Sequence, residues 1–169
     1  MPNRSLVNLK TGEYFLVSMD SKNLFKNKND YKYFLSIIEG CMTNNREVEV
    51  LAYCLNANHF CLLFCEFIDG GIEKLMHTLI RYFNKYIFDT YEIDDKLSES
   101  LYEIKKVNDK DLLNTSCGIH KKADDWADCE YSSIRAYFYD DTPPFLNKKH
   151  IADIYGSAVD YQKLISKLD

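Results

Sequence analysis

Six cysteines are the first residues whose type and spacing bear on chemistry. Zinc sites and thiol redox motifs usually carry two cysteines separated by two residues, and this chain has no such pair. In a reducing compartment we expect the six side chains to be mostly buried thiols, with a zinc site as the alternative. They are Cys41, Cys54, Cys61, Cys65, Cys117 and Cys129.

The charge of the chain argues against a protein that must bind duplex DNA. Its 169 residues include 21 Lys and Arg against 26 Asp and Glu, which gives a net charge of −5. An obligate duplex binder commonly has a basic face and a basic isoelectric point. The hydrophobic fraction of 46% supplies ample material for a core and argues against a disordered chain.

No segment predicts a membrane span or export. The longest apolar runs, such as residues 61–64, fall far short of the roughly 20 residues that a membrane helix requires. The polar N-terminal stretch lacks the apolar core of a secretory signal. We therefore expect a cytoplasmic protein, and the length is typical of one domain spanning residues 1–169.

The hydrophobic pattern predicts four strands, at residues 13–19, 47–55, 59–67 and 101–107. Residues 47–55 alternate as a half-buried strand does, whereas 59–67 is apolar almost throughout, as in a central strand. The four residues between Leu55 and Phe60 form a plausible tight turn, so these two strands are expected to make an antiparallel hairpin.

Helical periodicity marks two long helices. One lies within residues 27–42 with Asn29 or Asp30 as its N-cap, and the other covers 72–91. Shorter helices are expected within 109–122 and 149–168. The order strand, helix, strand, strand, helix, strand predicts an α+β fold of the ferredoxin-like type, an antiparallel sheet with helices packed on one face.

Four segments occur in the order expected of one protein family. Residues 51–64, LAYCLNANHFCLLF, are similar to a strand-turn-strand phrase AYCLMPNHFHLL, and residues 130–137, EYSSIRAY, to a phrase WSSyraY. Residues 24–38 and 72–86 are similar to the family's two helices. Together they resemble the REP-associated branch of the single-tyrosine HUH, or IS200-like, transposases. The resemblance covers roughly residues 13–140 and leaves 141–169 as a C-terminal helical extension.

The resemblance implies a metal site on one strand. In the family two His residues flank one bulky residue, so that both lie on one face and hold Mg²⁺ or Mn²⁺. The corresponding residues here are His59 and Cys61. Because Mg²⁺ prefers oxygen and Cys suits zinc, we expect no resident cofactor unless the protein is active. The alternative is that His59 is hydrogen-bonded within the sheet and Cys61 is a small buried residue.

The resemblance also locates the nucleophile. In the family a Tyr hydroxyl attacks the scissile phosphate of DNA. Aligning LLNTSCGIHKK, residues 112–122, puts Gly118 at the Tyr position and Lys122 where a third metal ligand is found. Glycine has no group to attack with, and Lys122 would repel a metal, so the active site is interpreted as degenerate. Outside candidates for a displaced nucleophile are Tyr82, Tyr86, Tyr102 and Tyr131.

Three functions follow as hypotheses. The first is a transposase-like protein that binds single-stranded or hairpin DNA without cutting it; the second is an active, metal-dependent tyrosine transposase using a displaced Tyr; the third is a protein-interaction module. A homodimer is expected under all three, because similar family members often join sheets through edge strands. The candidate DNA contacts, which are otherwise a solubilising surface, are Lys22, Lys26, Lys28, Lys32, Lys105 and Lys106.

Overall fold

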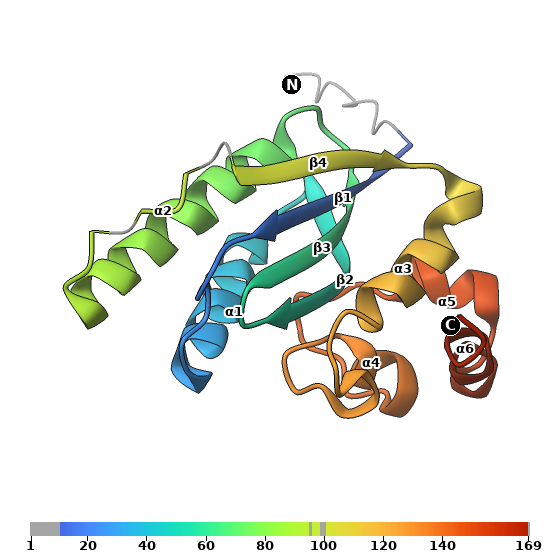
Figure 1. Ribbon diagram of the computed structural model, residues 1–169. Helices are drawn as coiled ribbons and strands as arrows, with labels where there is room; N and C mark the ends of the chain where they lie inside the picture. Colours follow the sequence, from blue (N-terminus) through green and yellow to red (C-terminus); the bar gives the residue numbers. More distant parts are fainter. Residues whose placement is uncertain (1–10, 95, 99–100, 169) are drawn as a thin grey trace, which may run out of the picture.

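A four-stranded antiparallel sheet organises the chain. The computed structural model describes residues 11–94, 96–98 and 101–168 (Figure 1). Its strands are β1 (Glu13–Asp20), β2 (Val48–Asn56), β3 (His59–Glu66) and β4 (Tyr102–Val107), in the spatial order β2-β3-β1-β4. The predicted α+β class, all four strands and the β2–β3 hairpin are confirmed.

Two long helices, α1 (Lys28–Met42) and α2 (Gly71–Tyr91), cover one face of this sheet (Figure 1). Phe34 of α1 lies with its ring centroid 5.2 Å from that of Phe60 on β3 and 5.2 Å from that of Phe83 on α2. Alternation along the strands therefore assigns Phe60 and its cross-strand partner Met19 to the helix-covered face. His59 and Cys61 project from the opposite face.

The N-terminus of α1 is tied to α2 through a buried carboxylate. Asn27 is the N-cap, so the expected cap at Asn29 or Asp30 is wrong by two or three positions. Asp30 stands third in the helix and reaches back to accept from the backbone N–H groups of Lys26 (2.7 Å) and Asn27 (3.1 Å), as a capping box does. It also accepts from the hydroxyls of Tyr86 (2.9 Å) and Tyr91 (2.8 Å) on α2.

The outer edge of β2 is occupied by the protein's own C-terminal third. The Leu55 N–H donates to the Tyr131 carbonyl (2.9 Å), and the Ser133 N–H donates to the Tyr53 carbonyl (2.9 Å). The Tyr137 hydroxyl donates to the Leu51 carbonyl at 2.7 Å. Residues 130–137, which carry part of the family resemblance, thus act as a docking segment, and a second copy cannot extend the sheet at β2.

Four helices form this C-terminal third: α3 (Leu112–His120), α4 (Ile134–Tyr139), α5 (Lys149–Tyr155) and α6 (Ala158–Ile165). They gather beyond β2, and α3 also packs on the sheet face opposite α1 and α2 (Figure 1). Consequently β2 is buried on both faces from Val50 to Leu55, and the expectation of a half-buried strand is wrong for that stretch. Every helix in the described ranges is too short or too polar to cross a bilayer.

The buried Asp30 carboxylate yields a stability prediction. Asp30→Asn should lower the free energy of unfolding by about 2–4 kcal/mol, because the amide cannot accept from four donors at once and its NH₂ group faces other donors. Tyr91→Phe removes one donor and should cost about 0.5–1.5 kcal/mol. Urea unfolding of the three proteins measures both; equal stability of Asp30→Asn and wild type would contradict the bridging role.

Candidate functional site

Three side chains form a hydrogen-bonded row at one end of the sheet. Asp20, the last residue of β1, pairs in register with His59, the first residue of β3. The His59 Nδ1 lies 2.7 Å from the Asp20 carboxylate, and its Nε2 lies 2.8 Å from the Cys61 sulfur. Because a carboxylate only accepts, Nδ1 donates to Asp20, and the Cys61 thiol donates to Nε2. The sequence placed His59 and Cys61 on one face, and Asp20 was missed.

This row does not fit a divalent metal. Zinc held by an imidazole and a thiolate, at about 2.0–2.3 Å from each, would separate nitrogen and sulfur by about 3.5 Å in tetrahedral geometry. Here the two atoms are in direct contact at 2.8 Å. Burial raises the pKa of the Cys61 thiol to about 11, although the nearby Lys122 opposes this rise. Cys61 therefore stays a neutral thiol and is only 2% exposed.

Gly118 offers no nucleophile but has room for one. It lies exposed in the last turn of α3, and a Cβ placed on it would meet nothing within 4 Å. Lys122 follows just beyond the end of this helix. Its carbonyl accepts from the Asn56 side chain at 3.3 Å, which places the C-terminal end of α3 beside the β2–β3 turn.

Three of the four outside candidates for a displaced nucleophile lie on the other side of the sheet from His59. Tyr82 is 45% exposed on α2. The Tyr86 hydroxyl is bound to Asp30, and Tyr102 pairs with Met19, which assigns it to the helix-covered face. The sheet thus separates these three side chains from His59. Tyr131 stacks on Tyr31, with ring centroids 4.2 Å apart and planes at 8°.

The predicted lysines do not form one surface. Lys22 and Lys26 line a cleft of about 80 Å³ together with Lys96, which sequence analysis missed. Lys28 and Lys32 are exposed on α1. Lys105 and Lys106 point to opposite faces of β4, because neighbouring residues of a strand alternate. The Lys106 ammonium forms an ion pair with Glu13 at 2.6 Å.

The Lys22–Lys26–Lys96 cleft adjoins the end of the sheet that carries His59. The Ser21 N–H donates to the Asn58 carbonyl (2.9 Å), and the Asn23 N–H donates to the Asn58 side chain (2.8 Å). The loop after β1 is therefore held against the β2–β3 turn. Lys26 also lies over the Tyr91 ring, 4.4 Å from its centroid.

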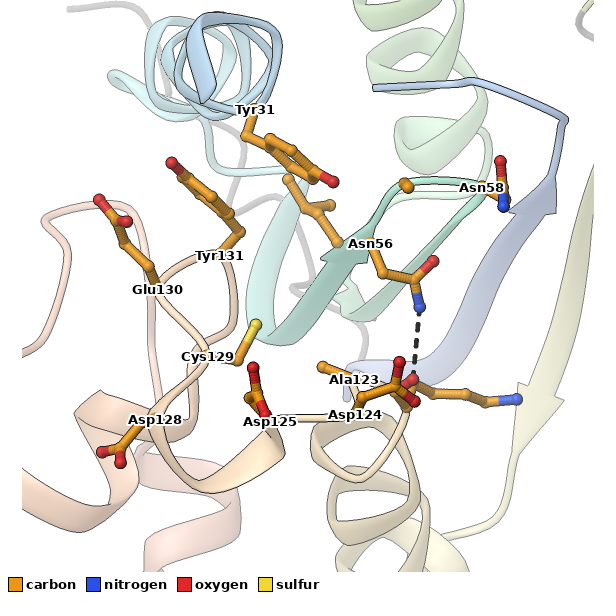
Figure 2. A pocket seen from close by; sticks show the side chains of 13 residues that line it. Tyr31, Asn56, Asn58, Ala123, Asp124, Asp125, Asp128, Cys129, Glu130 and Tyr131 are labelled. Carbon is orange, nitrogen blue, oxygen red and sulfur yellow. Dashed lines mark hydrogen bonds between the residues drawn. The ribbon is translucent and has the colours of Figure 1, made fainter. Parts of the chain in front are cut away.

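A larger cavity, of about 520 Å³, opens on the other side of the β2–β3 turn (Figure 2). It lies between that turn and the loop after α3. Lys122 is a cation in its lining, and the same lining holds four carboxylates, which belong to Asp124, Asp125, Asp128 and Glu130. This wall disfavours a phosphate, in contrast to the Lys22–Lys26–Lys96 cleft.

A buried hydrogen-bond network holds α3 in place. The two ring nitrogens of His120 lie 2.6 Å from the Tyr161 hydroxyl and 2.7 Å from the Ser133 hydroxyl. Ser133 in turn accepts from the Tyr53 N–H at 2.8 Å, and Tyr161 bonds Ser116 at 2.6 Å. Burial lowers the pKa of His120 to about 3, so its imidazole is neutral.

Comparison with known proteins identifies the fold. A solved structure described as a REP-associated tyrosine transposase bound to a REP hairpin is similar, with a TM-score of 0.58 and 14% sequence identity. The similarity covers 87% of this chain and 92% of that chain. No protein-family model and no curated protein matches the sequence. The chain therefore has the fold seen in a tyrosine transposase.

Because the space around Gly118 is open, we expect a tyrosine to be tolerated at this position. Gly118→Tyr should raise the free energy of unfolding by about 0.5 kcal/mol, since Tyr is the better helix former and meets no obstacle. The matched control is Gly71→Tyr in α2, where a Cβ alone would lie 2.9 Å from Val48. That variant should be destabilised; a similar loss in Gly118→Tyr would show that position 118 is not open.

The neutral His120 predicts a pH dependence. Between about pH 6.5 and 3 the unfolded chain binds a proton at this residue and the folded protein does not, so stability falls as the pH falls, by up to about 1.4 kcal/mol per pH unit. Denaturant unfolding from pH 7 to 4 should show a shallower decline for His120→Gln, despite its lower stability at pH 7. Parallel profiles for the two proteins would contradict a buried neutral imidazole.

Proposed function

We propose that the protein binds single-stranded or hairpin DNA and does not cut it. The observation that carries this proposal is the shared fold, over 87% of the chain, with a transposase that was solved on a hairpin. The lysines predicted from the sequence contribute unequally, because Lys105 and Lys106 face opposite ways. The Lys22–Lys26–Lys96 cleft is the better candidate for phosphate contacts.

Three features support binding without cleavage. Position 118 carries no side chain, the His59 imidazole is bonded to Cys61 and Asp20, and Lys122 places a cation near the Cys61 thiol. Strand cleavage by a tyrosine needs a metal-polarised phosphate and a hydroxyl aligned for attack. Neither group is provided by these residues.

The acidic wall of the larger cavity restricts where DNA would lie. Its carboxylates repel phosphates, whereas the three lysines of the cleft attract them, and the two surfaces flank the same β2–β3 turn. Phosphates that contact these lysines would lie outside the acidic cavity. Because the proposed binding rests on contacts between lysines and phosphates, it should weaken as the salt concentration rises.

The binding test compares two triple variants. Lys22, Lys26 and Lys96 changed together to Ala should weaken binding of labelled hairpins and single strands about tenfold or more at low salt. The slope of log affinity against log salt should also shrink by about two units. The control carries the same charge change at Lys149, Lys163 and Lys167, three exposed lysines of α5 and α6 and the residues after it. Equal losses in both variants, or no binding by wild type, would contradict the proposed surface.

The cleavage test looks for a covalent protein–DNA adduct. Wild type incubated with hairpin DNA and Mg²⁺ or Mn²⁺ should give no adduct on a denaturing gel. An adduct would establish the alternative, an active transposase with a displaced tyrosine, and individual Tyr→Phe changes would then identify the nucleophile. If the protein neither binds DNA nor forms an adduct, the remaining hypothesis is a protein-interaction module.

A homodimer is also part of the proposal, with one restriction. Because the C-terminal third occupies the β2 edge, a dimer that joins sheets would use β4. Light scattering measures the oligomeric state directly.

A further inference from the structure

Cys129 and Cys54 bring two thiols together beside the acidic cavity. Cys54 is fully buried on β2, where it pairs with Ser132 across an isolated bridge. Cys129 is partly exposed, lines the cavity, and directs its sulfur toward the strand (Figure 2). The Leu55–Tyr131 and Tyr53–Ser133 backbone bonds hold this loop against β2, and the Cys54 thiol is hydrogen-bonded to Cys129.

The two thiols differ in their electrostatic surroundings. A hydrogen bond from the Cys54 thiol and one from the Tyr131 backbone lower the pKa of Cys129 below the ordinary thiol value, against the opposing effects of burial and of the Asp125 and Glu130 carboxylates. The same hydrogen bond, together with burial, raises the pKa of Cys54, so that its proton stays on. All six cysteines lie in the described ranges, and burial raises the pKa of the other four, Cys41, Cys61, Cys65 and Cys117.

We propose that Cys129 and Cys54 form a reactive dithiol site for hydroperoxides, in which Cys129 attacks and Cys54 resolves. The exposure of the two thiols fits these roles. Cys129 is partly exposed and lines the cavity, where a hydroperoxide can reach it, whereas Cys54 is buried. This site is independent of DNA binding, and none of its residues belongs to the Asp20–His59–Cys61 row.

The chemistry balances with one hydroperoxide. The Cys129 thiolate attacks the terminal peroxide oxygen, the O–O bond breaks, and the alkoxide leaving group takes up a proton to become an alcohol, which leaves a sulfenic acid on Cys129. The Cys54 sulfur then attacks the Cys129 sulfur. An S–S bond forms, the S–O bond breaks, and the departing hydroxide combines with the Cys54 thiol proton as water. Two thiols lose two electrons, and the hydroperoxide gains them.

The product would covalently join β2 to the wall of the cavity. The Cys54 thiol is hydrogen-bonded to Cys129 in the reduced protein, so the disulfide would form between two neighbouring side chains. Oxidation would therefore fix residues 129–131, which line the cavity, against the strand.

The test treats the full chain with an equivalent of hydrogen peroxide or cumene hydroperoxide, blocks the remaining thiols with N-ethylmaleimide, and maps the peptides by mass spectrometry. Wild type should lose two hydrogen atoms and yield a peptide linking Cys54 to Cys129. In Cys54→Ser the reaction should stop at a sulfenic acid on Cys129, which dimedone traps. Cys129→Ser should form no disulfide.

A second measurement uses only the wild-type protein, so its outcome does not depend on whether a variant folds. At neutral pH, iodoacetamide should modify Cys129 roughly tenfold or more faster than Cys41, the other partly exposed cysteine, because thiolate and not thiol reacts. Comparable rates at the two cysteines, or peroxide-treated wild type without the Cys54–Cys129 link, would overturn the proposal.

Discussion

The hydrogen bonds of the buried His120 are the constraint on which the arrangement of the C-terminal third depends. This imidazole joins α3 to Ser133, and through Tyr161 it joins both to α6. The Ser133 hydroxyl in turn accepts a hydrogen bond from the backbone N–H of Tyr53 on β2. A charged ring would be costly in this low-dielectric interior, so the network requires a neutral ring with both nitrogens satisfied. Its consequence is that α3, and with it Gly118, is fixed over the sheet.

The Asp20–His59–Cys61 row lies at one end of the sheet, where the packing of β3 does not depend on a metal ligand at position 61. Cys61 lies opposite Ser18 on β1 and Cys54 on β2, and its small apolar body fits the interior whether or not it binds a metal. The ladder bonds of β3 do not depend on this side chain. A change at position 61 therefore alters the donor set and leaves the hairpin in place.

Charge is distributed around the same end of the sheet in two opposed groups. Lys22, Lys26 and Lys96 converge on one side of the β2–β3 turn, and four carboxylates line the cavity on the other. A net charge of −5 describes the sum and conceals this separation. Local fields of this kind, more than net charge, decide which side of a small protein a nucleic acid approaches.

The sequence by itself determined the four strands, the helices other than α4, and their order. Period-two and period-3.6 patterns are local properties, and the apolar run of β3 signals a strand buried on both faces. The resemblance of residues 112–122 also assigned Gly118 to the position of the family's tyrosine, an assignment that needs no structure. The burial of both faces of β2 escaped the pattern, because the cover comes from α3 and the docking segment, which follow more than fifty residues later.

Only the tertiary structure decided which side chains meet. Asp20 and His59 are 39 residues apart, Lys96 after α2 joins Lys22 and Lys26 from the segment before α1, and Cys129 is hydrogen-bonded to a thiol on β2. No periodicity encodes such pairs, because each depends on how strands register and where loops dock. The sequence therefore fixes the frame, and the chemistry of the site is set by contacts that form only when distant segments pack together.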